Sequence, residues 1–193
     1  LKIAPAGAQA AIQTGVAHTK IDIEEYKEKI ESLLGPTRKI LRNVRKQISL
    51  KNKKRTKPLI VLTSGEDLRV IKAAKQVASG GELRIALLGN EKNIAKNAQQ
   101  AHVNLENENI EIIDPNFSPQ KQNYTKLLYE LRQHKGISQE QAQTKVCDHN
   151  YFASLMLKQS HAQGMVSGIN SKYRSAIRSV LQVVGTKKNK ILS

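Results

Sequence analysis

Arg132 is the side chain whose type and position point most directly to chemistry on a charged ligand. It follows an apolar stripe with the spacing of a helix, formed by Tyr124, Leu127, Leu128 and Leu131. A guanidinium presents a planar pair of donors that fits two phosphate oxygens. The helix dipole also favours a cation near the carboxyl end of any helix. The residues alone therefore leave two interpretations of Arg132, a phosphate ligand and an ordinary surface arginine.

The stretch Ser64-Gly-Glu-Asp67 is a second place where an anion could be held. It follows an apolar run typical of a strand and precedes an amphipathic helix. Free backbone N–H groups at the start of a helix can bind an anion. The same letters also fit a capping box, in which Ser64 satisfies those N–H groups itself. We favour the capping box.

The histidines and the cysteine show no pattern for a metal site or a nucleophile. The five histidines are scattered at positions 18, 102, 134, 149 and 161, without the spacing of metal ligands. Cys147 is followed directly by Asp148 and His149, but neighbouring residues of a helix point in different directions. We therefore predict no metal site and an idle or buried thiol at Cys147.

The chain has 193 residues and a net charge of +16, and the excess sits in two segments. Residues 35–57 hold ten Lys or Arg and no acid, and residues 171–193 hold six and no acid. Such a run could neutralise nucleic-acid phosphates. However, no aromatic residue within 38–57 offers a platform for base stacking, so a solvated linker is favoured. A basic nucleic-acid-binding module stays open as a rival hypothesis.

Membrane and export signals are lacking in the sequence. No apolar run approaches the ~18–20 residues that span a bilayer, and residues 1–20 have no continuous apolar core of a signal peptide. The single Cys147 excludes an internal disulfide and fits a reducing compartment. We expect a cytoplasmic protein without a membrane partner.

The elements that must position these residues alternate between strands and helices after Pro58. Apolar runs predict strands at 59–63, 83–88, 110–113 and 164–168, and helical patterns lie between and after them. This order is typical of a parallel α/β sheet. Before Pro58 the sequence predicts only helices, near 3–12, 22–34 and 37–48, followed by a basic linker at 51–57. A strand start is also expected at Ile191-Leu192.

Several stretches of residues 58–193 resemble the first half of the phosphate acetyl/butyryl transferase domain. They are Gly65-Glu-Asp-Leu-Arg69, Ile112-Ile-Asp-Pro115, Tyr129-Glu-Leu-Arg-Gln-His-Lys-Gly136, Asn150-Tyr-Phe152, Gly164-Met-Val-Ser-Gly168, and Arg178 with Gln182. The resemblance implies half of a three-layer, parallel-sheet domain of the phosphotransacetylase type, like that of isocitrate and isopropylmalate dehydrogenases. A helical arm would precede this half-domain.

The first residues are similar to a different part of a larger enzyme family. Ile3-Ala-Pro-Ala6, Ala10-Ala11, Gly15-Val-Ala17, and Asp22 with Tyr26 resemble the end of the coenzyme-binding domain of bacterial malic enzymes. Large members of that group carry a phosphotransacetylase-like domain at the carboxyl end. The order of parts implies residues 1–28 from the coenzyme-binding domain, 29–57 as linker, and 58–193 as half of the transferase-like domain.

The resemblance implies a fragment of an NADP-dependent malic enzyme, which converts malate to pyruvate. NADP and a divalent metal, Mg or Mn, would belong to a catalytic part upstream of Leu1, and this piece would bind neither. Its expected roles are homo-oligomerisation and sensing of acetyl-coenzyme A. The enzymatic rival is a phosphate acetyltransferase, which moves an acetyl group between phosphate and coenzyme A. That family's catalytic serine, arginine and aspartate would lie beyond Ser193.

The resemblance also assigns ligand-binding residues. It implies that Arg132 faces the active cleft and binds the acyl phosphate or the coenzyme, and that Arg178 is the second cleft arginine. The context of Arg178 departs from the family, because Lys172, Tyr173 and Arg174 replace small hydroxyl residues before it. This departure favours ligand sensing over catalysis.

Overall fold

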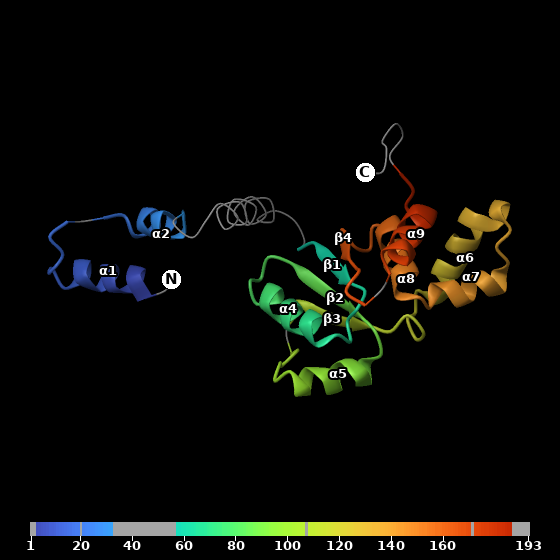
Figure 1. Cartoon of the computed structure of the whole chain (residues 1–193), viewed down its shortest axis with the longest axis horizontal. Helices are drawn as coiled ribbons and strands as arrows, with labels where there is room; N and C mark the ends of the chain where they lie inside the picture. Colours follow the sequence, from blue (N-terminus) through green and yellow to red (C-terminus); the bar gives the residue numbers. More distant parts are fainter. Residues whose placement is uncertain (1–2, 20, 33–56, 107, 171, 187–193) are drawn as a thin grey trace. The chain divides into compact units, whose positions relative to one another are not determined.

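The computed structural model describes residues 3–19, 21–32, 57–106, 108–170 and 172–186 (Figure 1). The chain divides into two compact units, Leu1–Arg55 and Thr56–Ser193. The predicted helix at 37–48, nearly all of the basic linker and the strand start at 191–192 lie outside the described residues. The assignment of 1–28 and 29–57 to a coenzyme-binding domain and a linker stays a prediction.

The first unit contains two short helices among its described residues. They are α1 (Ile3–Gln13) and α2 (Ile23–Ser32). Asp22 caps the second helix, since its Oδ1 accepts from the backbone N–H of Glu24 at 2.7 Å and of Glu25 at 3.0 Å. A carboxylate there satisfies N–H groups that have no partner within the helix.

The second unit is built on a four-stranded parallel sheet. Its strands are β1 (Leu59–Leu62), β2 (Arg84–Leu88), β3 (Ile110–Ile113) and β4 (Gly164–Val166). Their order across the sheet is β3-β2-β1-β4, and every pair is parallel. The chain therefore passes from β1 outward to β3 and returns past β1 to form β4. The predicted α/β fold with a parallel sheet is confirmed.

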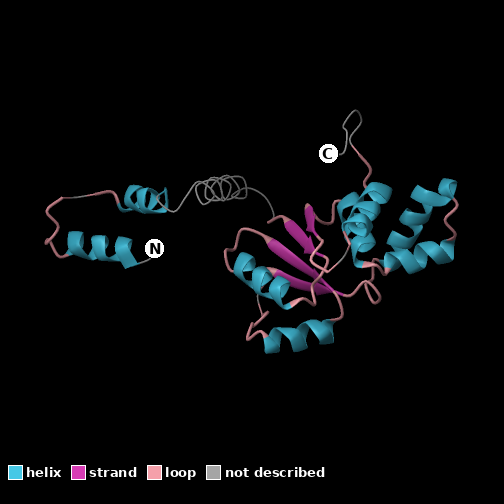
Figure 2. Ribbon diagram, viewed as in Figure 1, coloured by secondary structure: helices cyan, strands magenta, loops and turns pink. Residues whose placement is uncertain are grey.

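Helices cover both faces of this sheet (Figure 2). They are α4 (Leu68–Ala78), α5 (Glu91–Gln100), α6 (Lys121–Arg132), α7 (Gln139–Val146), α8 (His149–Lys158) and α9 (Tyr173–Val183), with a 3₁₀ turn at Gln133–Lys135. Among these described helices, none combines the length and apolar character that crossing a bilayer requires.

Two apolar cores form because strand residues alternate between the faces of the sheet. Leu59 and Val61 pack into a core with α6 to α9, whereas Ile60 and Leu62 pack toward α4 and α5. A strand buried on both faces has apolar residues at successive positions, as β1 does over Leu59–Leu62. The result is the predicted three-layer arrangement of helix, sheet and helix.

Two local predictions were wrong. The capping box at Ser64 does not form, because Asp67 is the N-cap of α4 and its carboxylate accepts from the backbone N–H of Arg69. Residues 64–67 instead close a turn through Asp67 N–H and the carbonyl of Ser64 at 3.0 Å. Strand β2 begins at Arg84, one residue later than expected.

Candidate functional site

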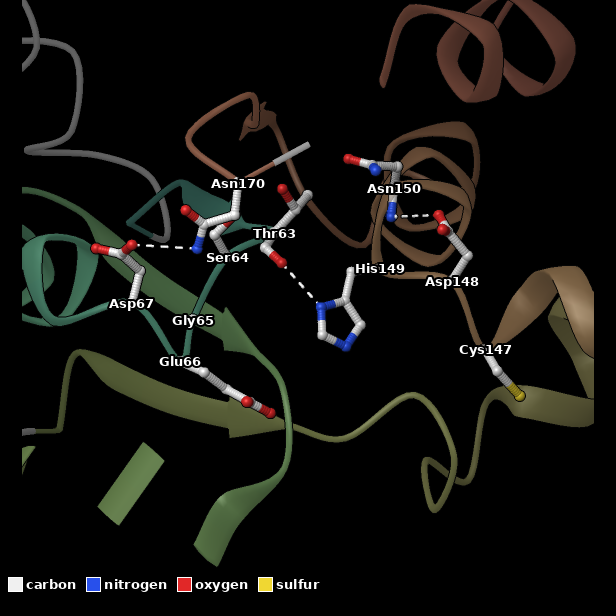
Figure 3. Close-up of a pocket in the computed structure, with 10 residues that line it drawn as sticks. All are labelled: Thr63, Ser64, Gly65, Glu66, Asp67, Cys147, Asp148, His149, Asn150 and Asn170. Atoms are coloured by element: carbon white, nitrogen blue, oxygen red, sulfur yellow. Dashed lines mark hydrogen bonds between the residues drawn. The ribbon is translucent and has the colours of Figure 1, made fainter. Parts of the chain in front are cut away.

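A cavity of about 430 Å³ opens where β1 ends and α8 begins (Figure 3). Its lining residues come from the turn after β1, from the start of α8 and from the segment after β4: Thr63, Ser64, Gly65, Glu66, Asp67, Cys147, Asp148, His149, Asn150 and Asn170. Ligands of open α/β sheets bind outside the carboxyl ends of the strands. The cavity lies at that edge.

The turn after β1 is fixed against β2 by Gly65. The backbone N–H of Gly65 donates to the carbonyl of Leu88 at 3.0 Å. A Cβ at residue 65 would lie only 2.6 Å from the Leu88 oxygen, so no larger residue fits without a shift of the backbone. The neighbouring Glu66 carboxylate then accepts from the backbone N–H of Asn90 at 2.8 Å and from the Asn93 side chain at 3.2 Å.

Asp67 joins two segments that lie about a hundred residues apart in the sequence. Its carboxylate accepts from the Arg69 guanidinium at 2.8 and 3.0 Å and from the Asn170 side chain at 3.1 Å. The Arg69 guanidinium holds the pKa of Asp67 well below its usual range, and the Asn170 hydrogen bond acts in the same direction. This pairing fixes the segment after β4 beside the turn after β1.

His149 is the titratable ring that lines the cavity. Its Nδ1 lies 2.9 Å from the carbonyl oxygen of Thr63. Because a carbonyl oxygen only accepts, Nδ1 is the donor of this hydrogen bond. Figure 3 shows Nδ1 toward Thr63 and the other nitrogen turned away from it. Sequence reasoning missed His149, because 86 residues separate it from Thr63 and only the fold brings them together.

Cys147 and the acidic residues of the cavity form no nucleophilic or metal-binding group. The Cys147 thiol donates to the carbonyl of Gln143 at 3.5 Å, one turn earlier in α7. Within the described ranges, no three His, Cys, Asp or Glu side chains gather as they would to hold a metal ion. The cavity therefore offers hydrogen-bonding groups and one histidine, and neither sequence-predicted arginine lines it.

Sequence comparison decides the family. The family described as phosphate acetyl/butaryl transferase matches residues 41–193. The chain belongs to this family. A phosphate acetyltransferase of Helicobacter pylori is 38% identical over 159 residues, which are 82% of this chain and 30% of that protein.

The chain is also similar to a solved phosphotransacetylase structure and to a malic enzyme. The EutD phosphotransacetylase from Staphylococcus aureus has a TM-score of 0.63 and 32% sequence identity, covering 68% of this chain and 39% of that one. An NADP-dependent malic enzyme of Rhizobium meliloti is 28% identical over 182 residues, 93% of this chain and 23% of that protein. The chain thus spans well under half the length of each of these relatives.

Within this transferase domain, the two predicted arginines lie on helices beside one tyrosine. Arg132 ends α6 and is half-buried, and Arg178 is an exposed residue of α9. Burial and the Asp148 carboxylate raise the pKa of Tyr151, while the positive charges of Arg178 and Arg132 oppose that rise. Their role as ligands of an acyl phosphate or coenzyme stays a prediction.

The departure from the family before Arg178 falls at the start of α9. Lys172 occupies the N-cap position without a capping hydrogen bond from its side chain, and the helix begins at Tyr173. Lys172, Tyr173 and Arg174 are all exposed. These basic and aromatic residues thus face solvent at this end of the helix.

Proposed function

We propose that the unit Thr56–Ser193 provides acyl phosphate and coenzyme A binding for acetyl transfer between phosphate and coenzyme A. The family match over residues 41–193 is the observation that carries this proposal. The degree of similarity supports it further, because the Helicobacter pylori phosphate acetyltransferase is 38% identical and the Rhizobium meliloti malic enzyme 28%.

The placement of Arg132 and Arg178 is consistent with this chemistry. In the reaction the thiolate sulfur of the coenzyme attacks the acetyl carbonyl, the bond from carbon to the phosphate oxygen breaks, and phosphate leaves. Guanidinium groups stabilise the negative charge on phosphate through charge-assisted hydrogen bonds. The exposed Arg178 and half-buried Arg132 are available to do so from two helices beside Tyr151. No residue of this chain is assigned to proton transfer or nucleophilic attack.

Equilibrium binding tests the proposal. The full chain, titrated calorimetrically with acetyl-coenzyme A and separately with acetyl phosphate, should bind both. NADP and malate serve as comparison ligands and should not bind. A chain that binds neither acetyl-coenzyme A nor acetyl phosphate would show that this unit does not supply the substrate site.

A second candidate is a part of an NADP-dependent malic enzyme. One observation favours it: the alignments with malic enzymes of Rhizobium meliloti and Salmonella typhimurium cover 93% and 96% of this chain. The transferase family begins only at residue 41, so these alignments must extend into the segment before it. In this role the unit would serve oligomerisation and acetyl-coenzyme A sensing. NADP and Mg²⁺ or Mn²⁺ would act elsewhere in the protein.

Antibodies against this chain can separate the two candidates. Protein captured from the source cells would be assayed for NADP reduction with malate and for acetyl-coenzyme A formation from acetyl phosphate. Acetyl transfer without malate oxidation supports the transferase. Malate oxidation that responds to acetyl-coenzyme A supports the malic enzyme, and capture by preimmune serum controls for unrelated activities.

A further inference from the structure

Asn150 is a buried polar side chain that lines the cavity at the start of α8. The residue is 7% exposed, and its Oδ1 accepts from the Ser167 hydroxyl at 2.6 Å. Because Oδ1 faces this hydroxyl, the Nδ2 group at the other corner of the amide is directed away from Ser167. The residue that directly follows β4 therefore fixes the orientation of the Asn150 amide.

The Nδ2 group of Asn150 is a donor without a protein partner. It forms no hydrogen bond within the described part of the chain. No buried side-chain nitrogen or oxygen of the described residues lacks a partner, so Nδ2 is accessible. Figure 3 shows the amide extending from α8 toward the side of the cavity where Thr63 and Asn170 lie. A donor in a largely buried position needs an acceptor, and the cavity is where a ligand can supply it.

Ser64 adds a second hydrogen-bonding group, from the turn after β1. Its carbonyl accepts from the Asp67 N–H at 3.0 Å, which fixes the backbone there. The Ser64 hydroxyl forms no hydrogen bond with the residues that the structure describes. A hydroxyl both donates and accepts. Two segments far apart in the sequence thus each offer one unused hydrogen-bonding group to the same cavity.

Three carboxylates also line the cavity, and the protein already engages each of them. Glu66 and Asp67 are held by the contacts described above, and Asp148 accepts from two backbone N–H groups of α8 at 2.9 and 3.1 Å. No Lys or Arg is among the described residues of the lining. This negative charge disfavours a phosphate, because like charges repel.

The cavity therefore suits an uncharged group that carries a hydrogen-bond acceptor. The carbonyl oxygen of an amide is such an acceptor, and the amide N–H can donate to the Ser64 hydroxyl. The volume of about 430 Å³ lies within the ~300–1,000 Å³ typical of small-ligand sites. A short chain that contains amide groups fits these properties, whereas a phosphate does not.

We propose that the cavity binds an uncharged, amide-bearing chain, that Asn150 Nδ2 donates to its carbonyl oxygen, and that Ser167 is the positioning residue for Asn150. The identification of this chain with the pantetheine arm of coenzyme A rests on the proposed function. Asn150 is then the specificity-determining residue, which selects the uncharged part of the coenzyme while the carboxylates of the cavity keep its phosphates outside.

NMR titration of the ¹⁵N-labelled full chain with reduced pantetheine tests this proposal. Pantetheine should shift the side-chain NH₂ resonance of Asn150 and reach saturation. Asn150→Asp identifies that resonance, because the resonance disappears in its spectrum. Orthophosphate at the same concentration should leave the resonance in place. No shift with pantetheine, or an equal shift with orthophosphate, would overturn the proposal.

Asn150→Asp also measures the contribution of the donor. It keeps the shape of the side chain and an acceptor for the Ser167 hydroxyl, but it replaces the donor with an acceptor. Pantetheine binding should weaken by about tenfold or more. Asn123→Asp makes the same change at an exposed amide on α6 and is the matched control. Far-UV circular dichroism checks that both variants are folded, and equal affinities would contradict the role of Asn150.

Ser167→Ala tests positioning without touching the donor. The Asn150 amide then loses the bond that orients it, so pantetheine binding should weaken by about 2–5-fold, and Ser167→Thr, which keeps the hydroxyl, should bind like the parent. In the Asn150→Asp background Ser167→Ala should add no further loss, because the two residues act through one contact. Additive losses would assign Ser167 a merely structural role and overturn its positioning role.

The outcomes distinguish this proposal from the proposed function. If pantetheine does not bind, or binds equally to the Asn150→Asp and Asn123→Asp variants, the amide site is wrong even where acetyl-coenzyme A binds. If pantetheine binding depends on Asn150 but neither acetyl-coenzyme A nor acetyl phosphate binds, the site stands and the transferase function fails.

Discussion

Arg132 and Arg178 differ in burial, and this difference sets what each should contribute to binding. A charge-assisted hydrogen bond typically contributes ~1.5–3 kcal/mol, and less where water competes. We predict that Arg132→Ala weakens acetyl-coenzyme A binding by ~10–100-fold and that the more exposed Arg178→Ala weakens it by ~3–10-fold. Calorimetry on the full chain measures both losses, with Lys72→Ala as control. Unchanged affinity in both variants would mean that other residues hold the ligand.

His149 should contribute to stability through its bond to the Thr63 carbonyl, which ties α8 to the end of β1. We predict that His149→Ala lowers the free energy of unfolding by about 1 kcal/mol. Asparagine places an amide donor near the position of Nδ1, so His149→Asn should retain most of the stability. Urea unfolding compares the variants. Equal losses for alanine and asparagine would show that the hydrogen bond does not matter.

Tyr124 gives a pH dependence whose sign follows from its burial. Burial raises the pKa of Tyr124 from 10.0 to about 12. The folded state therefore keeps its proton where the unfolded chain loses it. This contribution to stability is complete below about pH 10 and is lost as pH rises toward about 12. Unfolding of the parent should become easier over that range, and Tyr124→Phe should remove this part of the dependence. An unchanged alkaline slope in the phenylalanine variant would contradict the assignment.

At the residue scale the family resemblance, and not residue type alone, singled out Arg132 and Arg178. Their role as ligands stays a prediction. The sequence did not single out His149, whose partner is the Thr63 carbonyl. It also did not single out Tyr151, whose phenol donates to Gln182 and whose ring lies under Lys145 of another helix. Such contacts depend on how helices pack, which no local spacing reveals.

At the scale of elements, the turn between β1 and α4 should be the most sensitive connection. A Cβ at residue 65 would meet backbone atoms of Leu87 and Leu88 at 2.6–3.0 Å, and backbone cannot move aside cheaply. We predict that Gly65→Ala destabilises the unit by ~1–3 kcal/mol. Gly164→Ala is the comparison, since its Cβ meets only the flexible end of Ile60 at 3.0 Å and should cost less. Thermal unfolding ranks the two, and the opposite order would refute the steric argument.

Helices and strands were predictable where burial imposes a regular pattern of apolar residues. They were less predictable where a turn and the start of a helix compete for the same residues. The run at 110–113 matched β3, and the run at 59–63 matched β1 to within one residue, because apolar side chains of both strands pack into the cores on both faces of the sheet. The start of α4 was misplaced, since Ser64 and Asp67 are both good caps. Packing of Gly65 against Leu88 holds residues 64–67 in a turn and leaves the cap to Asp67.

For the whole molecule, the role of the basic segment 35–57 is the first question that its charge raises. Most of the basic segment 35–57 lies outside the described residues, so the nucleic-acid hypothesis stays untested. Lys57, within it, is already engaged, donating to the Asn109 side chain at 2.9 Å. The division of the chain between Arg55 and Thr56 falls close to the predicted boundary at Pro58. The domain assignments on either side of that boundary stay predictions.

At the scale of the whole molecule, we predict that the edge of strand β4 promotes self-association of the second unit. In the described sheet β4 pairs only with β1, so its outer edge carries unpaired backbone groups. Val166 beside that edge is 56% exposed, and Ile169 after it is 47% exposed. The net charge of +16 opposes association, but at ~0.15 M salt charges further apart than about 8 Å are largely screened. We therefore predict concentration-dependent oligomers at that salt, measured by sedimentation velocity.

Val166→Lys should weaken the association by about 1 kcal/mol, or roughly fivefold, through lost apolar contact. Val77→Lys makes the same change on α4, away from the edge, and should leave association unchanged. A chain that stays monomeric at every concentration, or equal effects of the two lysines, would show that the β4 edge does not drive association.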